Sequence, residues 1–145
     1  RFIEFMDVGN TNAWSLEKVV PAQEILEAIN AELPIEAIPA NYRGEVAQRY
    51  RYLDGSGEFG VITSITQPFC GDCTRARLSP EGELFTCLFG STGYDFRSLL
   101  RTGASDDQIK KELVSLWGRR TDKYSELRTA ATRDLIRVEM SHIGG

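Results

Sequence analysis

The chain has 145 residues, a hydrophobic fraction of 41%, a charged fraction of 26% and a net charge of −4. This composition is typical of a folded domain, and its acidic balance offers no overall basic field for a nucleic-acid partner. No apolar run of about 18 residues and no secretory signal is visible, so we expect neither a membrane span nor export. Three clustered cysteines favour a reducing, cytoplasmic setting over a disulfide framework.

The N-terminal residues predict a strand followed by a helix. Residues 1–6 (RFIEFM) are rich in aromatic and β-branched side chains and indicate a strand, which the turn-rich residues 7–12 end. Apolar residues recur at helical spacing from Pro21 to Leu33, and proline suits the first turn of a helix. Because the sequence opens within a strand and without methionine, we expect it to be part of a longer protein.

The next stretch predicts β-structure. Residues 35–38 lie between two prolines and indicate a short edge strand. Residues 46–53 and 58–65 have strand-like patterns, and the Asp54-Gly55 pair between them favours a hairpin turn. The arginines of this region are interpreted as a solvated strand face: Arg43, Arg49 and Arg51.

Residues 70–87 contain every cysteine of the chain, namely Cys70, Cys73 and Cys87. The C-x-x-C spacing of the first two lets both thiolates reach one metal ion from a tight turn. The segment Ser79-Pro-Glu-Gly82 predicts a turn, so the residues around it should form a second hairpin. With a three-residue loop, Ser79 lies opposite Glu83 and Arg75 lies opposite Cys87.

This register assigns the side chains of the second hairpin to two faces, because successive residues of a strand alternate. One face carries the cysteines and two guanidinium groups: Cys73, Arg75, Arg77, Phe85 and Cys87. The other face is mostly apolar and is expected to pack on a core: Thr74, Ala76, Leu78, Leu84, Thr86 and Leu88.

Three thiolates are one ligand short of a four-cysteine iron–sulfur site and of a closed zinc site. The fourth ligand could be the single histidine, His142, or a substrate. Arg75 and Arg77 favour an anionic substrate, because guanidinium groups bind phosphate bidentately and stay charged. From spacing alone, iron–sulfur and zinc remain open alternatives, the latter with both arginines as exposed strand residues.

The C-terminal part predicts two helices and a polar tail. Residues 96–101 indicate a short helix that Gly103 follows. Ser105 is a suitable N-cap for a second helix, which ends at Gly118. Residues 119–139 lack periodicity and are expected to be extended, and the chain closes on two glycines.

Three blocks of the sequence resemble one family. They are C-G-D-C-T-R-x-R-L-S-x-E-G-x-L-x-x-C-L-F at residues 70–89, the opening RFIEFMDVGN and the ending MSHIGG. Together they resemble the C-terminal half of the molybdenum cofactor biosynthesis protein A family. That family comprises radical S-adenosylmethionine lyases, the GTP 3′,8-cyclases.

The resemblance implies an α/β fold in three parts. Residues 1–40 would be the C-terminal strand–helix portion of an incomplete (β/α) TIM-like barrel. Residues 41–125 would form a small α+β region that binds a [4Fe–4S] cluster and GTP. Residues 126–145 would be an extended tail ending in Gly-Gly.

The resemblance also implies the conversion of GTP to 3′,8-cyclo-7,8-dihydro-GTP, the first step of molybdopterin biosynthesis. In that family pattern Cys70, Cys73 and Cys87 hold a [4Fe–4S] cluster whose open iron meets GTP. The residues matching GTP contacts are Arg1, Arg75, Ala76 and Arg77. Met6 matches a contact to S-adenosylmethionine, and Gly144 and Gly145 match a tail that assists the chemistry.

The full-length proteins of that family would bind S-adenosylmethionine on a second [4Fe–4S] cluster. They would form homodimers and pass their product to the next enzyme of the molybdopterin pathway. The 145 residues contain no C-x-x-x-C-x-x-C motif for the second cluster, so we expect them to be inactive alone. Two alternatives remain: the auxiliary-cluster domain of another radical S-adenosylmethionine enzyme, and a zinc-stabilised interaction module.

Overall fold

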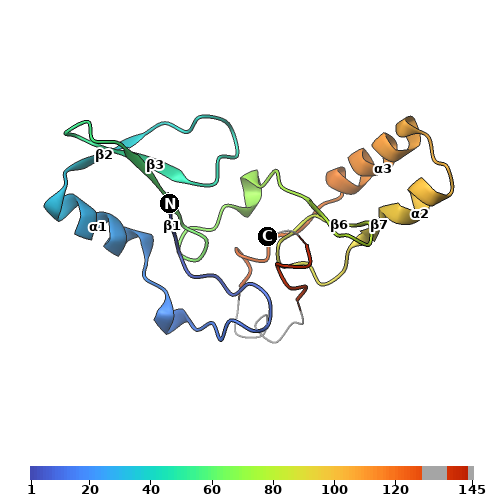
Figure 1. Cartoon of the computed structure of the whole chain (residues 1–145), viewed down its shortest axis with the longest axis horizontal. Coiled ribbons are helices and arrows are strands. Elements are labelled where there is room, and N and C mark those ends of the chain that lie inside the picture. The colour runs from blue at the N-terminus through green and yellow to red at the C-terminus, as the bar shows by residue number, and fades with distance from the viewer. Residues whose placement is uncertain (129–136, 144–145) are drawn as a thin grey trace. The chain divides into compact units, whose positions relative to one another are not determined.

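The computed structural model describes residues 1–128 and 137–143 of the chain (Figure 1). It divides into two compact units, each with its own elements. Unit 1 comprises residues 1–7 and 13–74, and unit 2 comprises residues 8–12 and 75–145. The mixed α/β class predicted from the sequence is confirmed, because each unit contains both strands and helices. In the described ranges, no helix has the length and apolar character needed to cross a bilayer.

Unit 1 contains a four-stranded sheet in the order β1 (Phe2–Ile3), β4 (Glu58–Ile62), β3 (Gln48–Tyr52), β2 (Ile35–Ile38). β1 runs parallel to β4, and the other neighbours are antiparallel. The predicted hairpin and the predicted edge strand are therefore confirmed. The N-terminal strand is shorter than its sequence predicts, because only two residues pair with β4.

The helix α1 (Ala22–Glu32) covers this sheet and forms the core of unit 1 with it. Pro21 is its N-cap, so the predicted helix is confirmed to within one residue at that end. Ala22, Phe59 and Val61 are buried at the centre of the contact. Partly buried side chains surround them: Leu26, Ile29, Ile35, Tyr50 and Tyr52. Short 3₁₀ turns, η1 (Leu16–Lys18) and η2 (Cys70–Asp72), complete the unit.

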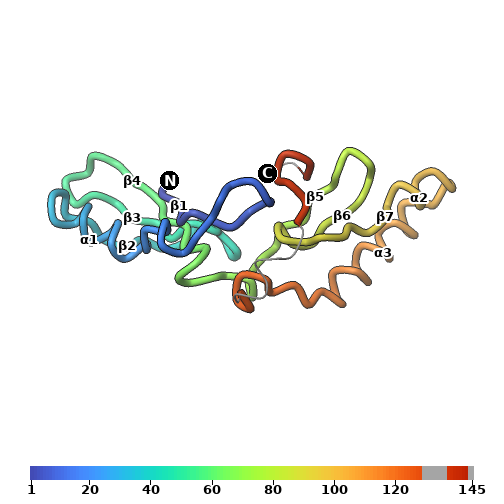
Figure 2. Tube along the Cα trace, turned by 90° about the horizontal axis from the view of Figure 1, so that it is seen from below, coloured from blue at the N-terminus to red at the C-terminus, as the bar shows by residue number. Residues whose placement is uncertain are grey.

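Unit 2 contains a three-stranded antiparallel sheet and two helices (Figure 2). The strands are β5 (Arg77–Leu78), β6 (Glu83–Phe85) and β7 (Tyr94–Asp95), in that order. The helices α2 (Phe96–Arg101) and α3 (Asp106–Gly118) follow them. Both helices were predicted, and Ser105 is the N-cap of α3 as its sequence indicates. Residues 123–127 form a hydrogen-bonded turn, where the sequence predicted an extended chain.

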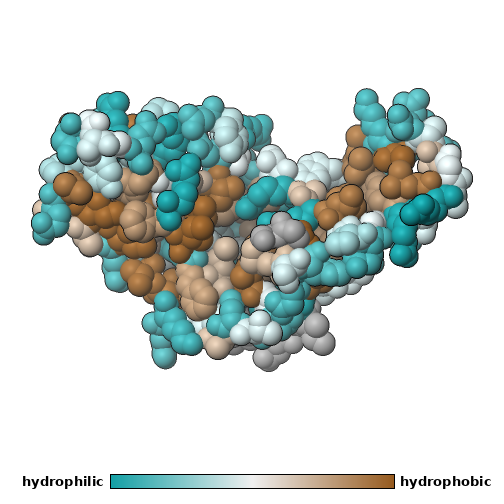
Figure 3. All heavy atoms as spheres, viewed as in Figure 1, coloured by the Kyte–Doolittle hydropathy of each residue, from teal (hydrophilic) through white to brown (hydrophobic). Residues whose placement is uncertain are grey.

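The predicted packing of the apolar face of the second hairpin is found only in part, with Thr86 buried. The apolar face of the second hairpin does not pack into a closed core, because the Leu78 side chain remains 60% exposed. Ala76 and Leu84 instead line an open hollow of about 510 Å³ beside α3. The other lining residues belong to that helix: Leu113, Val114, Leu116, Trp117 and Gly118. Figure 3 shows apolar side chains exposed in the region of α3.

Candidate functional site

The C-x-x-C segment forms the tight turn that its spacing predicts. Cys70 opens the η2 turn, and the backbone N–H of Cys73 donates to the carbonyl oxygen of Cys70 at 3.2 Å. Neither cysteine is in a disulfide bond, and both are half-buried. Two thiols on one short turn, with partial access to solvent, are a donor pair suited to a metal ion.

A loop of unit 1 lies directly against this turn. The backbone of Gly44 has a φ of +83°, and a Cβ atom there would lie 3.1 Å from the carbonyl oxygen of Asp72. It would also lie 3.3 Å from the Thr74 side chain. Glycine is therefore favoured both by the left-handed backbone and by the close approach. The Arg43–Asp72 ion pair at 3.6 Å adds little, because the two side chains are 91% and 68% exposed.

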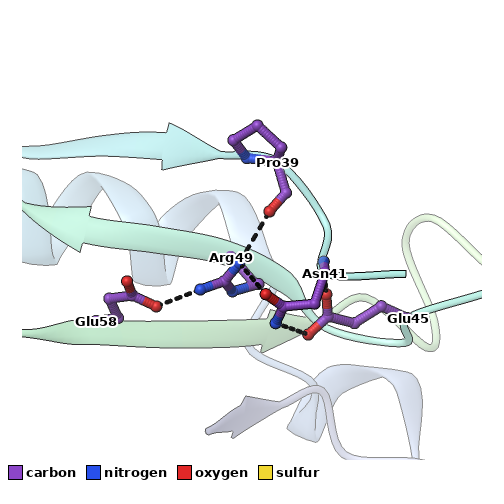
Figure 4. A network of polar contacts seen from close by, with 5 residues as sticks. All are labelled: Pro39, Asn41, Glu45, Arg49 and Glu58. Carbon is purple, nitrogen blue, oxygen red and sulfur yellow. Dashed lines mark hydrogen bonds and ion pairs between the residues drawn. The ribbon is translucent and has the colours of Figure 1, made fainter. Parts of the chain in front are cut away.

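Arg49 holds the loop that contacts the cysteine turn (Figure 4). Its guanidinium donates to the carbonyl oxygen of Pro39 at 3.0 Å and to Oδ1 of Asn41 at 2.8 Å. It also pairs with the Glu58 carboxylate at 2.5 Å, and the Asn41 backbone N–H donates to Glu45 at 2.6 Å. Only 18% of the Arg49 side chain is exposed, so its interpretation as a solvated residue is wrong. These acceptors come from two segments, the loop between β2 and β3 and the strand β4, a convergence that the strand pattern alone does not reveal.

In unit 2, the register of the second hairpin is confirmed close to its turn. Arg77 pairs with Phe85, and the backbone N–H of Ser79 donates to the carbonyl oxygen of Glu83 at 2.9 Å. Cross-strand partners share a face, so the Arg77 side chain lies on the same side as Phe85. Phe85 is 3% exposed, which makes this the better covered side of the hairpin.

The register does not continue to the third cysteine. β6 ends at Phe85, and Cys87 lies in the turn that follows, where its carbonyl oxygen accepts from Gly90 at 3.2 Å. The predicted pairing of Arg75 with Cys87 is therefore wrong. Beyond the ladder, the buried Thr86 hydroxyl donates to the Asp122 carboxylate, a contact with a distant segment. Cys87 is half-buried and is not in a disulfide bond.

The three consecutive residues expected to contact GTP differ in exposure. Arg75 and Arg77 are half-buried, whereas Ala76 is exposed and lines the hollow beside α3. Ala76 therefore offers only its backbone to a ligand on the arginine side of the hairpin.

Two further candidates lie in unit 1, on either side of β1 in the sequence. Arg1 is exposed, and its Cδ and one guanidinium nitrogen lie 3.0 and 3.1 Å from where a Cβ on Gly60 would be. Its stem therefore covers the β4 backbone at that point. Met6 is half-buried and follows β1.

A residue between them, Glu4, was given no role from the sequence but is 1% exposed. Its carboxylate accepts backbone N–H groups from Ala22 at 2.9 Å, Ile65 at 2.7 Å and Thr66 at 2.9 Å. The Thr66 hydroxyl donates to it as well, at 2.6 Å. Burial alone would raise the pKa of Glu4, but the hydrogen bonds from Thr66, Ala22 and Ile65 outweigh it and lower the pKa. The sequence signal that could have identified Glu4 is a single acidic residue inside an otherwise apolar strand.

The terminal segment lies in unit 2 as far as Ile143, which is 1% exposed. Nε2 of His142 lies 3.1 Å from Oε2 of Glu81, at the turn of the second hairpin. A hydrogen bond from its own backbone N–H, and more weakly one from Ser79 and the charge of His142, lower the pKa of Glu81. The histidine considered as a fourth ligand thus has a carboxylate partner. Gly144 and Gly145 lie outside the described residues.

A family model described as Molybdenum Cofactor Synthesis C matches residues 1–126. The chain belongs to this family. The resemblance stated from its sequence blocks is therefore confirmed.

Several relatives carry the name GTP 3′,8-cyclase. The protein of Acidothermus cellulolyticus is 56% identical over 132 residues, which cover 88% of this chain and 36% of that protein. The protein of Staphylococcus haemolyticus is 45% identical over all of this chain and 44% of its own length. The protein of a Synechococcus species is 48% identical over all of this chain and 41% of its own length. The chain spans less than half the length of each of these relatives.

The three cysteines are the candidate ligands of a metal centre. Cys70 and Cys73 belong to unit 1 and Cys87 belongs to unit 2. Within residues 1–128 and 137–143, no three His, Cys, Asp or Glu side chains are grouped as ligands of one metal ion. The donor chemistry nevertheless fits an iron–sulfur cluster, because three half-buried cysteines outside any disulfide bond can supply thiolate ligands.

Proposed function

We propose that this chain is the substrate-side part of a GTP 3′,8-cyclase, acting in the first step of molybdopterin biosynthesis. The observation that carries the proposal is the C-x-x-C turn, with two half-buried cysteines outside any disulfide bond, in a chain of the Molybdenum Cofactor Synthesis C family. The names of the relatives supply the reaction, and Arg75 and Arg77, which follow the turn in the sequence, would bind its substrate.

In this proposal Cys70, Cys73 and Cys87 hold a [4Fe–4S] cluster. When bound, a three-thiolate cluster offers one iron without a protein ligand, to which the guanine base of GTP can attach. The turn at Cys70 and Cys73 is built to stay in place, because the loop around Gly44 lies against it and Arg49 holds that loop. Cys87 follows the short strand β6 and completes the donor set.

Arg75 and Arg77 would bind the triphosphate. A nucleoside triphosphate carries about four negative charges at neutral pH, which fixed guanidinium groups offset and orient. The position of Arg77 on the covered side of the hairpin favours this role, because partial burial strengthens its interaction with an anion. Ala76 would contribute its backbone, and Arg1 a third guanidinium.

Unit 1 would contribute the end of an incomplete (β/α) barrel. Its parallel β1–β4 pair and the covering helix α1 are the kinds of element such a barrel contains. Met6, just past β1, would contact S-adenosylmethionine held on a second [4Fe–4S] cluster. Gly144 and Gly145 would assist the chemistry from the terminal segment. The full-length protein would be a cytoplasmic homodimer and would deliver its product to the next enzyme of the pathway.

The test is to reconstitute the chain anaerobically with iron and sulfide, and then to titrate it with GTP while the EPR spectrum is recorded. We expect about four irons per chain, as a cubane cluster requires, and a signal that changes with GTP. Cys87→Ser should lower the iron content. No turnover is expected from the chain alone, because the motif for the second cluster is missing from its sequence.

Arg75→Ala and Arg77→Ala separate substrate binding from the cluster. Both variants should keep their iron and lose the response to GTP. Arg101→Ala, on the exposed side of α2, is the matched control and should behave as the parent. Bound zinc without iron uptake would favour the zinc-stabilised module. A full cluster that ignores GTP would favour the auxiliary domain of another radical enzyme.

A further inference from the structure

The turn-rich loop after β1 contacts the far end of the sequence. Residues 8–12 group with unit 2, and in Figure 2 this loop lies beside the terminal segment. The backbone N–H of Asn10 donates to Oε1 of Glu139 at 2.8 Å, and its side-chain amide donates to the same oxygen at 3.1 Å. These contacts join residues 129 positions apart in the chain.

The Asn10 side chain also makes two hydrogen bonds to the backbone of one residue, one as donor and one as acceptor. Its Nδ2 donates to the carbonyl oxygen of Arg137 at 2.6 Å, and its Oδ1 accepts from the Arg137 backbone N–H at 3.1 Å. An amide can donate and accept at once, whereas a carboxylate can only accept. Asparagine thus satisfies both backbone groups of Arg137, as a neighbouring strand would.

The preceding residue, Gly9, is adapted to the same contact. Its φ is +66°, and a Cβ atom there would lie 2.1 Å from Oε2 of Glu139. Any larger residue would force the Glu139 carboxylate away from Asn10 and would strain the left-handed backbone. The Gly9 carbonyl oxygen in turn accepts from the Arg137 guanidinium at 3.4 Å.

Arg137 links this contact to the segment that carries the third cysteine. It is 8% exposed, donates to the Tyr124 hydroxyl and lies 5.0 Å from the centre of the Tyr124 ring. That ring stacks on Phe89, with centroids 4.3 Å apart. Phe89 is two residues beyond Cys87 in the sequence.

The residues that Asn10 contacts, Arg137 and Glu139, lie at the start of the terminal segment. His142 donates its backbone N–H to the Glu139 carbonyl oxygen at 3.0 Å, and Ile143 donates to Met140 at 3.2 Å. The turn therefore starts at a residue that Asn10 holds and ends at the buried Ile143.

We propose that Gly9 and Asn10 form a positioning clamp that fixes residues 137–139 and so determines where the terminal segment starts. Neither residue touches substrate in this role; both act through the segment that they hold. The functional consequence rests on the proposed cyclase activity, in which the terminal glycines assist the chemistry. The clamp itself does not depend on that activity and can be measured without it.

The first measurement is hydrogen–deuterium exchange of the 145-residue chain. Asn10→Asp keeps the size of the side chain but removes its donor and sets a carboxylate against Glu139. We expect exchange across residues 137–143 to accelerate about tenfold, as the loss of one to two hydrogen bonds predicts. Asn30→Asp is the matched control, because Asn30 accepts a bond from the Ile35 N–H at 3.0 Å and aspartate keeps the acceptor.

A second variant keeps the first measurement decisive if Asn10→Asp lowers overall stability. Asn10→Asp combined with Glu139→Gln restores a donor across the same pair, so part of the protection should return. Unchanged exchange in Asn10→Asp would overturn the clamp. Equal loss of protection in Asn30→Asp, or no recovery in the double variant, would also overturn it.

The second measurement is turnover of GTP by the full-length protein that carries this chain. Asn10→Asp should lower kcat by about tenfold to a hundredfold, because a misplaced group loses its orientation, and leave the KM for GTP unchanged. An unchanged kcat with lost protection would overturn the positioning role. If the parent itself shows no cyclase activity, the proposed function fails, while the exchange measurement still decides the clamp.

Discussion

The two antiparallel hairpins of this chain are stabilised in different ways. β3 and β4 pair at four positions, and Phe59 and Val61 of β4 are buried under α1. β5 and β6 pair at only two positions, and Leu78 on their apolar side is largely exposed. The first hairpin therefore depends on packing of aromatic side chains. The second depends on its turn and on polar contacts such as that of Thr86 with Asp122.

This difference agrees with our proposal that the second hairpin carries residues that bind the substrate and the cluster. Burying a charged or polar side chain without a partner is costly, so a tightly packed hairpin is a poor place for a binding residue. The short second hairpin carries Arg77 and leads directly to Cys87 without burying either completely. In unit 1, the candidate thiols likewise lie on a turn outside the packed sheet.

The largest effect should come from truncating the centre of the packed hairpin. Phe59 is 7% exposed and contacts the rings of Phe2, Tyr50 and Tyr52, with centroids 5.3 to 5.8 Å apart. Phe59→Ala should lower the free energy of unfolding by about 3–5 kcal/mol, from lost burial and the cavity left behind. Urea denaturation followed by circular dichroism measures this change.

Leu78→Ala in the second hairpin is the matched truncation. Because Leu78 is 60% exposed, this change should cost less than about 1 kcal/mol. Similar losses in the two variants would contradict the contrast between the hairpins.

The next effect concerns Glu4, which ties three segments of unit 1 together. Glu4→Gln replaces one acceptor oxygen by an NH₂ group that faces the N–H donors of Ile65 and Thr66 or of Ala22. A buried donor without an acceptor costs about 1–3 kcal/mol, so the variant should lose about that much stability. The measurement is the urea midpoint at neutral pH, with Glu32→Gln, at the exposed end of α1, as the control.

The pH dependence of the same variant gives a second check. The pKa of Glu4 is lower in the folded state, so its contribution is complete above the unfolded value of about 4.3. That contribution disappears as the pH falls through the folded-state pKa, because the carboxylate must then be protonated. The stability gap between parent and Glu4→Gln should narrow at acid pH. A gap that widens there would show that the carboxylate is not the stabilising form.

Local rules predicted much of this structure from the sequence. Alternation, helical spacing and turn residues identified α1, the first hairpin, α2 and α3 to within a few residues. They also predicted the register of the second hairpin beside its turn, since Pro80 and Gly82 restrict the backbone there. The C-x-x-C turn was predicted in the same way, because its geometry depends on four adjacent residues.

The rest depends on contacts between distant residues. Glu4 binds partners 61 and 62 positions away, and Asn10 binds partners 127 and 129 positions away, so no local pattern marks them. The pairing of Arg75 with Cys87 was also wrong: β6 ends at Phe85, and the next residue, Thr86, binds Asp122, 36 positions away. A single acidic or amide residue in an unusual setting was the only sequence signal.

The smallest effect concerns how the helices of the two units begin. The N-cap of α1, Pro21, makes no side-chain hydrogen bond, and Glu4 accepts from the Ala22 N–H instead. α3 is capped locally: Ser105 accepts from the Gln108 N–H, and Gln108 accepts from the Ser105 N–H at 2.8 Å. Ser105→Ala should therefore cost about 1 kcal/mol and affect α3 alone.

Amide exchange in the first turn of α3 measures this cost. Ser115→Ala is the control in the same helix, because alanine favours an exposed helix interior and should cost nothing. If Ser105→Ala left α3 unchanged, the local cap would be dispensable and unit 2 would rely on packing as unit 1 does. If exchange rises in α3 and stays constant in α1, the two helices begin by different means. A distant carboxylate then stabilises the start of α1 as part of the unit 1 core, whereas α3 carries its own start signal.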